Sequence, residues 1–491
     1  MRSSAPLATA LAAILALTAV TAVDAKPQKA KAPMASTAVA VSVFDQAAAL
    51  RDAALKSNVA YDFLEELTTR FGPRPAGSES EKRAAEWAVK KLTALGFQNA
   101  HIESFPLHVW ARGGPETIAI TGDFAQPLVG VSLGGSTAGT VEAETVMFDT
   151  YQQFLDSKQD VTGKIVVILQ PMAKASNGSG YGRMSGTVRS KGPIESQKRG
   201  AVGFVMRSLS TDNNRFPHAG ASTWTDGKGI PSMAISAPDA AQLSRIHAMQ
   251  AKGTAGPITI KMTTTGIFKG LGTSQNVVAD LVGSEHPEQV IVVGGHLDSW
   301  DLGTGAIDDG AGTAITMAAA KVMIDHDLKP KRTIRVVFWG SEEVSQPAGS
   351  PTSETGGGAF REAHKAELSN YVVHAESDFG ADKINNIALM KTDHPTFVTD
   401  IGNLLYPLGI YIDTKAVPNG GEDSGAMNDF VPAFDLNQDG YRYFDTHHTP
   451  NDTIDRVDPQ QLSQNVAAYT ATLWLIANTD VRFKLPPKEA K

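Results

Sequence analysis

The sequence predicts an α/β protein, in which a mostly parallel sheet is sandwiched by helices and interrupted by an inserted, mainly β domain. Two observations support this prediction. After residue 270, short apolar runs typical of strands alternate with longer segments of helical periodicity, the pattern of a parallel sheet covered on both faces. Between about 115 and 265 the composition changes, because many short apolar runs are separated by Gly, Ser, Asn and Thr. We therefore expect this segment to fold separately.

Bulk composition is that of a soluble globular protein. The 491 residues exceed the usual length of one domain, so at least two domains are expected. The hydrophobic share of 42% and the charged share of 20% are ordinary values. A net charge of −8 argues against nucleic acid as a partner. The chain has no cysteine, which excludes disulfides, a thiolate nucleophile and thiolate metal ligands.

The N-terminus has the features of a signal peptide over residues 1–25. A short positive start is followed by the apolar run Leu7–Val23, and small residues around Ala25 fit a cleavage site. An uncleaved membrane anchor is the alternative, but the apolar core is short and rich in Ala and Thr. We therefore expect an exported protein, secreted or periplasmic, without stable membrane insertion after cleavage. Residues 26–43, rich in Lys, Ala and Pro, are expected to form a flexible leader.

The α/β domain is expected to begin at residue 44 and to be interrupted after 114. Its first part has apolar residues at helical spacing in three segments, 47–56, 59–70 and 81–95. Ser78 or Ser80 can cap the third helix, after a turn-rich break at Gly72-Pro-Arg-Pro-Ala-Gly77. Alternating apolar and polar residues then predict a strand over 100–110.

The inserted domain is expected to span 115–265. Its apolar runs predict strands near 163–169 and 202–206, and a helix over 238–249. The segment 174–196 contains Asn177-Gly-Ser-Gly180 and is predicted to be a mobile surface loop.

The second part of the α/β domain is expected over 266–482, followed by a tail at 483–491. Its predicted strands are 276–282, 289–293, 333–339, 371–375 and 431–436. Its predicted helices are 312–324, 358–366, 396–405 and 459–477, the last with Asp458 as N-cap.

Five side chains able to bind metal follow apolar runs of this second part. They are His296, Asp308, Glu343, Asp378 and His448. The carboxyl ends of strands in an open α/β sheet converge on one crevice, so residues far apart in sequence meet there. Two imidazoles and three carboxylates suit two divalent metals, with zinc favoured, and indicate metal-assisted hydrolysis.

Neighbouring residues strengthen this interpretation. Asp298 is close enough in sequence to accept the second imidazole N–H of His296, and Asp452 could orient His448 in the same way. The adjacent carboxylates of Asp308 and Asp309 repel each other unless cations are present. In Glu342-Glu343, adjacent side chains of an extended segment point in opposite directions, so one glutamate can ligate metal while the other faces the substrate.

On these motifs the chain resembles the co-catalytic zinc exopeptidases, the family of bacterial leucyl aminopeptidases and plasma glutamate carboxypeptidase (carboxypeptidase Q), and most of all the carboxypeptidase Q branch. The shared segments are 71–78, 295–301, 306–310, 331–335, 376–378, 421–423 and 447–453. The insert resembles a protease-associated domain at 200–204 and 230–235. The loop 344–357 departs from the family, because it is longer and contains two prolines.

The resemblance implies two Zn²⁺ per chain. Asp308 would bridge them, with His296 and Asp378 completing one site, and Glu343 and His448 the other. Glu342 would be the general base and Asp298 the orienter of His296. The resemblance also implies a cis peptide between Asp308 and Asp309. The metals would activate water and polarise the scissile carbonyl.

We accordingly predict an exopeptidase that cleaves small peptides, first a carboxypeptidase Q-like dipeptidase and otherwise a broader aminopeptidase. A glutaminyl cyclase would use one zinc, and a receptor-like relative would have lost ligands, so the complete set of five argues against both. The insert is expected to narrow the cleft without supplying ligands, and its histidines, His218 and His247, to lie on the surface. Either the insert or the partner subunit of a homodimer could restrict access to the cleft.

The cleft-side loops carry charges of both signs. Glu422 and Asp423 are candidates for holding an α-amino group, and Arg361, Lys391 or Arg442 for holding an α-carboxylate. Candidates for both termini favour a dipeptide as substrate, since only a dipeptide presents both charges within one small site.

Overall fold

The computed structural model describes residues 39–485. The predicted signal peptide and residues 26–38 of the leader lie outside the described residues, as does the tail from 486 onward. Residues 41–43, expected to be part of the flexible leader, instead belong to the helix α1 (Val41–Ala54). Between residues 39 and 485, no helix is both long and apolar enough to cross a membrane.

The central sheet has the strand order β1-β10-β12-β11-β13. These strands are β1 (Gln98–Arg112), β10 (Gly266–Leu281), β12 (Arg332–Trp339), β11 (His286–His296) and β13 (Tyr371–Glu376). β11 runs parallel to both β12 and β13, whereas β10 is antiparallel to β12 and to β1. The predicted α/β class is confirmed, with the parallel strands β12, β11 and β13 on one side of the sheet and the antiparallel pairings of β10 on the other.

A smaller sheet of order β15-β14-β16 continues the central one beyond β13. Its strands are β14 (Ile384–Leu389), β15 (Tyr411–Ile412) and β16 (Phe434–Gln438). The two sheets are joined where His374 of β13 forms a parallel bridge with Ala433. The strand predicted over 431–436 corresponds to β16, which starts at Phe434 instead. β14 was not predicted, because its two asparagines weaken the apolar pattern.

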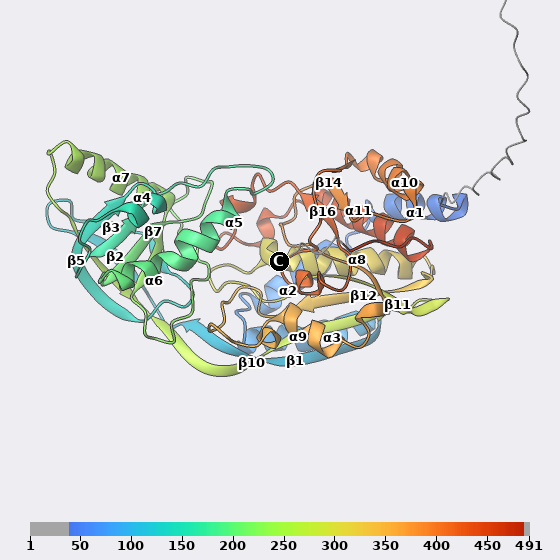
Figure 1. Ribbon diagram of the computed structural model, residues 1–491. Coiled ribbons are helices and arrows are strands. Elements are labelled where there is room, and N and C mark those ends of the chain that lie inside the picture. The colour runs from blue at the N-terminus through green and yellow to red at the C-terminus, as the bar shows by residue number, and fades with distance from the viewer. Residues whose placement is uncertain (1–38, 486–491) are drawn as a thin grey trace, which may run out of the picture. The chain divides into compact units, whose positions relative to one another are not determined.

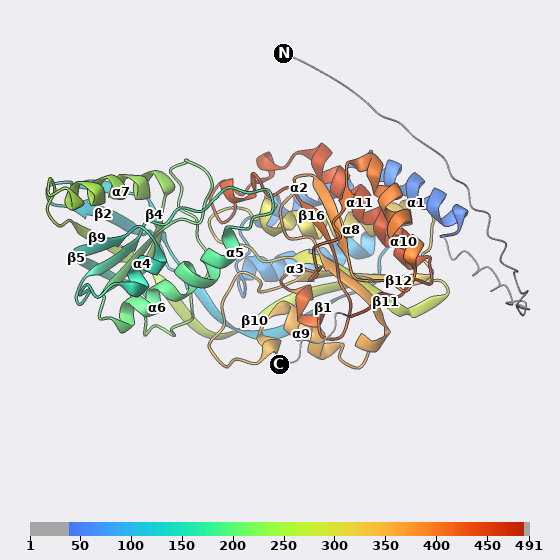
Figure 2. The same ribbon diagram turned by 45° about the horizontal axis from the view of Figure 1, so that its top comes forward.

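Helices cover both faces of the central sheet, as expected. Alternation along β12 shows this directly: Ile334, Val336 and Phe338 join the larger core, whereas Val337 and Trp339 join a second core on the other face. The larger core is formed with α1, α2 (Val59–Phe71), α3 (Glu79–Ala94), α8 (Ala311–Asp325), α10 (Pro395–Leu405) and α11 (Pro459–Ala477). The second core is closed by α9 (Gly356–Ala363). In both views α1, α8 and α11 lie side by side (Figures 1 and 2).

Helix starts follow the predicted caps. The Ser78 side chain accepts a hydrogen bond from the Glu81 N–H at the start of α3. Asp458 accepts from the N–H groups of Gln460 and Gln461 at the start of α11. Both caps satisfy backbone donors that have no partner within the helix.

The inserted segment forms its own eight-stranded sheet of order β3-β2-β9-β5-β6-β7-β8-β4 (Figure 1). The strands are β2 (Thr117–Thr121), β3 (Gln126–Leu128), β4 (Gly130–Ser132), β5 (Gly139–Phe148), β6 (Ile165–Ile168), β7 (Gly203–Arg207), β8 (Ser232–Ile235) and β9 (Thr259–Thr264). Its helices are α4 (Tyr151–Asp156), α5 (Tyr181–Met184), α6 (Ser190–Lys198) and α7 (Ala237–Ala251). The long antiparallel pair of β1 and β10 carries the chain into this sheet and back.

The predicted surface loop 174–196 is wrong over its second half. From Tyr181 onward the chain is helical, through α5, a π turn at Ser185–Arg189 and α6. Met184 and Val188 are buried in the core, and Gly192 lies so close to the Phe204 ring that a Cβ there would clash with it. Tertiary packing therefore overrides the low helix propensity of this Gly- and Ser-rich stretch.

Candidate metal centre

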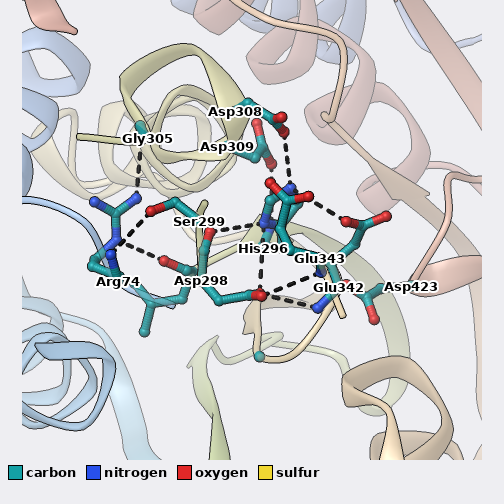
Figure 3. A network of polar contacts seen from close by, with 12 residues as sticks. Arg74, His296, Asp298, Ser299, Gly305, Asp308, Asp309, Glu342, Glu343 and Asp423 are labelled. Carbon is teal, nitrogen blue, oxygen red and sulfur yellow. Dashed lines mark hydrogen bonds and ion pairs between the residues drawn. The ribbon is translucent and has the colours of Figure 1, made fainter. Parts of the chain in front are cut away.

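The five predicted ligands converge at the carboxyl edge of the parallel strands. His296 ends β11, the Glu342-Glu343 pair follows β12, and Asp378 follows β13. Asp308 lies in the turn Ala306–Gly310 that leads into α8, and His448 follows β16. Figure 3 shows His296, Asp308 and Glu343 gathered in one place.

Asp308 lies between two groups of side chains. Its Oδ1 is 3.2 Å from His296 Nε2, which is 3.5 Å from Asp378 Oδ1. Its Oδ2 is 3.1 Å from His448 Nε2, which is 2.9 Å from Glu343 Oε2. The two oxygens of one carboxylate are therefore shared between two clusters, each of which can hold a divalent cation.

Two further side chains lie within reach of these clusters. His447 Nε2 is 3.4 Å from Asp308 Oδ2, and its ring stacks on that of His448 with centroids 3.5 Å apart. Asp309 groups with His296 and Asp378 within 4.8 Å. Asp309 and His447 lie in the segments 306–310 and 447–453 noted above, but neither was predicted to be a ligand.

The residues fit a cationic centre. Three buried carboxylate oxygens, Asp308 Oδ2, Glu343 Oε1 and Asp378 Oδ1, have no hydrogen-bond donor among the described residues. Burial, together with mutual repulsion, raises the pKa of the Glu343 and Asp378 carboxyls. Burial also opposes ionisation of Asp308, but His447, His296 and His448 hold its pKa well below the usual value. Buried oxygens that repel one another and lack donors need cations to compensate them.

The two adjacent glutamates contact different histidines of the site. Glu343 contacts His448 and its side chain is 5% exposed. Glu342 has a side chain that is 19% exposed, and its Oε2 lies 4.0 Å from His296 Nε2. Glu343 is therefore placed for ligation and Glu342 for contact with a substrate beside the cluster.

Asp298 supports both glutamates through the backbone (Figure 3). Its carboxylate accepts hydrogen bonds from the N–H groups of Glu342 at 3.0 Å and Glu343 at 3.2 Å. The His296 ring lies 3.0 Å from the Asp298 backbone carbonyl through Nδ1, but 3.6 Å from the Asp298 carboxylate. The imidazole is therefore oriented chiefly by the carbonyl, while the carboxylate fixes the glutamate pair.

The turn that carries Asp308 is held from two sides. The peptide between Asp308 and Asp309 is cis, as expected from the resemblance. The Asp309 carboxylate accepts from the N–H groups of His296 and Gly312. Asp452 accepts from Ile307 and Asp308, so it holds this turn and does not orient His448 as suggested from sequence.

Arg74 is a structural residue that sequence reasoning passed over. Its side chain is fully buried and donates to the carbonyls of Gly72, Leu297, Thr304 and Gly305. It therefore joins the loop after His296 to the turn before Asp308 (Figure 3). The signal was available in Gly72-Pro-Arg-Pro, where an arginine stands within a turn-rich break.

The insert contributes backbone contacts to the second cluster. The Ala219 N–H donates to the His448 carbonyl, and the Ala219 carbonyl lies 3.3 Å from His448 Nδ1. His448 has a φ of 60°, a left-handed conformation that is uncommon outside glycine. None of the candidate metal groups found within residues 39–485 includes a residue of the insert. His218 is nevertheless buried, 3.1 Å from Asp212 Oδ2, so its predicted surface position is wrong.

A cavity of about 690 Å³ opens beside the first cluster. Five carboxylates line it and none of its lining residues is Lys, Arg or His; the carboxylates are Glu376, Asp378, Asp413, Glu422 and Asp435. Asp423, the other candidate for an amine, is buried and accepts from the Gly357 N–H. An amino group is therefore the ligand that the charges of this cavity favour.

The three basic residues considered for a carboxylate do not line this cavity. Arg361 donates to Thr352 and Glu362, and Arg442 pairs with Asp382. Lys391 is exposed, and its carbonyl accepts from the Lys484 N–H. The long loop 344–357 lies against the insert, where the Ser345 hydroxyl donates to the Ser222 carbonyl.

Comparison with known proteins identifies the family. The family model described as "Peptidase family M28" matches residues 276–473. Carboxypeptidase Q of Bos taurus is 31% identical over 428 residues, which cover 86% of each chain. Carboxypeptidase Q of Homo sapiens is likewise 31% identical, over 433 residues covering 86% of each chain.

Solved structures share the fold. A crystal structure described as a peptidase M28 precursor from Shewanella amazonensis superposes with a TM-score of 0.84 at 39% identity, covering 91% of this chain and 99% of its own. An aminopeptidase from Aneurinibacillus has the same fold, with a TM-score of 0.60 at 19% identity, and the match covers 91% of this chain and 98% of the aminopeptidase. This chain is a metallopeptidase, and it belongs to peptidase family M28.

Proposed function

We propose that this peptidase is an exported, zinc-dependent exopeptidase that hydrolyses small peptides, acting as a dipeptidase of the carboxypeptidase Q kind. The observation that supports it most is the sharing of the two Asp308 oxygens between the His296 and His448 clusters. This arrangement suits two metal ions in one site, with Asp378 completing the first and Glu343 the second. The similarity to carboxypeptidase Q and the N-terminal sequence support the substrate class and the export.

The residues around the clusters account for the chemistry of peptide hydrolysis. When bound, the two metals supply Lewis acidity that activates a water molecule and stabilises negative charge on the scissile carbonyl. Glu342 accepts the proton of the attacking water and returns it to the leaving amine. Asp298 holds Glu342 in place through its N–H. Burial and the nearby Glu343 raise the pKa of the Glu342 carboxyl, and cations bound beside it would lower that pKa and keep the group ionised as a base.

Metal analysis and blocked substrates test this proposal. We expect two zinc equivalents per chain, because one would indicate a cyclase-like site and none a binding protein. We also expect turnover of a free dipeptide to be abolished by N-acetylation and by C-amidation. If the C-amidated dipeptide or a long peptide is cleaved as fast as the free dipeptide, the dipeptidase proposal is wrong and the aminopeptidase described next is favoured.

That alternative is a broader aminopeptidase, and the acidic cavity favours it. Glu422 lines this cavity and suits an α-amino group, whereas no basic residue lines it. If the site recognises only the amino terminus, chain length beyond the first residue should have little effect on KM.

A further inference from the structure

Arg189 of the insert is a buried cation with few partners. It ends the π turn Ser185–Arg189 and is only 9% exposed. Its Nε donates to the Ala221 carbonyl at 3.1 Å and its Nη1 donates to the Tyr181 hydroxyl at 2.6 Å. Within the described part of the chain, Nη2 makes no hydrogen bond and no carboxylate pairs with the guanidinium. Arg74, by contrast, is buried with four carbonyls around it.

The position of Arg189 is adjacent to the second cluster. Its Cζ lies 5.2 Å from the centre of the Tyr181 ring, which meets the His447 ring edge-on with centroids 4.9 Å apart. His447 in turn stacks on His448. The guanidinium is therefore close enough to act electrostatically on the site.

The backbone leaves room for this guanidinium. It lies against Gly220, where a Cβ would clash with Nη1 and Cζ. Gly220 also has a φ of 137°, which a side chain disfavours. The neighbouring Ala219 is the residue that contacts His448. Arg189 thus occupies a fitted place on the same short segment that reaches the second cluster.

A buried guanidinium that pairs with no carboxylate is unfavourable unless an anion joins it. A small peptide carries one fixed anion, its α-carboxylate, which a guanidinium binds through paired N–H donors. The acidic cavity adjoins the His296 cluster through Asp378, while Arg189 adjoins the His448 cluster. The two ends of a dipeptide therefore have complementary charges on opposite sides of Asp308.

We propose that Arg189 binds the α-carboxylate of the substrate and that Tyr181 positions its guanidinium. The inference rests on the proposed dipeptidase function and adds the residue that selects for a free C-terminus. It also gives the insert a part in substrate recognition, although the insert supplies no candidate metal ligand within the described residues.

The experiment compares a free dipeptide with its C-terminal amide in the zinc-loaded enzyme. Arg189→Gln keeps donors toward Tyr181 but removes the charge. On zinc-loaded Glu342→Gln protein, we expect Arg189→Gln to raise the dissociation constant of the free dipeptide about 10- to 100-fold, the range expected for loss of a charge-assisted pair, with no rise for the amide. Arg189→Lys keeps the charge and should retain part of the preference.

A matched control is Arg199→Gln. Arg199 is another insert arginine that lies over an aromatic ring, Phe154, and donates to the carbonyls of Phe154 and Leu155. It should leave the preference for the free carboxylate unchanged. Dissociation constants of both peptides, measured by calorimetry on zinc-loaded Glu342→Gln protein with and without Arg189→Gln, give a readout independent of turnover.

The outcomes separate the two proposals. If wild-type enzyme prefers the free dipeptide and Arg189→Gln keeps that preference, Arg189 is not the carboxylate site and the dipeptidase function stands. If Arg189→Gln slows both peptides equally, its role is structural and the inference is overturned. If wild-type enzyme does not discriminate between the peptides, the dipeptidase function itself fails.

Discussion

Replacing Asp298 with Asn separates two roles for this residue that the sequence could not distinguish. In the first, the carboxylate orients His296 and so supports a metal. In the second, it holds the backbone of the glutamate pair. The distances favour the second role, because the carboxylate accepts from Glu342 and Glu343 at 3.0 and 3.2 Å but lies 3.6 Å from His296.

The cost of Asp298→Asn follows from these contacts. An Asn side chain can accept from only one of the two N–H groups and turns a donor toward the other. Loss of one hydrogen bond to a charged acceptor costs about 1.5–3 kcal/mol, and a buried unpaired donor costs about 1–3 kcal/mol. A displacement of the glutamates that removes about 3 kcal/mol of transition-state stabilisation lowers kcat about 100-fold.

The assay measures kcat, KM and zinc content together. We expect Asp298→Asn to lower kcat while both zinc ions remain, because His296 keeps its contact with the Asp298 carbonyl. Asp301→Asn, in the same loop but paired with Arg112, is the control and should keep kcat near the wild-type value. If Asp298→Asn instead loses one zinc ion in proportion to its loss of activity, this reasoning is wrong and the Asp298 carboxylate supports a metal by orienting His296.

Two other substitutions test the glutamates. Glu342→Gln should keep both zinc ions and lower kcat about 10²- to 10⁴-fold, whereas Glu343→Gln should lose zinc; the reverse pattern by metal analysis would exchange their roles. Glu81 is fully buried, and burial together with the negative charge of Asp298 raises its pKa from 4.5 to about 8. Because the pKa of Glu81 is higher in the folded state, protonated Glu81 contributes to the free energy of unfolding. This contribution is fully present below a pH of about 4.5 and is lost as the pH rises through about 8, a total loss on the order of 5 kcal/mol. Denaturant unfolding of Glu81→Gln should lack this loss, and equal pH dependence in both proteins would count against it.

The convergence of the candidate ligands could be predicted because each follows a strong local pattern. His296, Glu343 and Asp378 stand directly after apolar strands, and parallel strands bring such positions to one edge. The cis peptide before Asp309 was expected only from the family resemblance. These features can be predicted from short segments of sequence alone, because they do not depend on how the rest of the chain packs.

The supporting contacts could not be predicted in the same way. Asp452 binds the N–H groups of Ile307 and Asp308 across more than 140 positions, and the Ala219 carbonyl reaches His448 across 229. No periodicity or spacing specifies such pairs, because they depend on how the insert and the central sheet pack. The burial of His218 and the helices after Tyr181 were missed for the same reason.

The two histidines of the site are held alike, although by different parts of the chain. His296 Nδ1 lies 3.0 Å from the carbonyl of Asp298, and His448 Nδ1 lies 3.3 Å from that of Ala219. A proton on Nδ1, bonded to a carbonyl, leaves Nε2 free for a metal. The first carbonyl belongs to the central α/β domain and the second to the insert. A chain without the insert would therefore keep the carbonyl contact of His296 and lose that of His448.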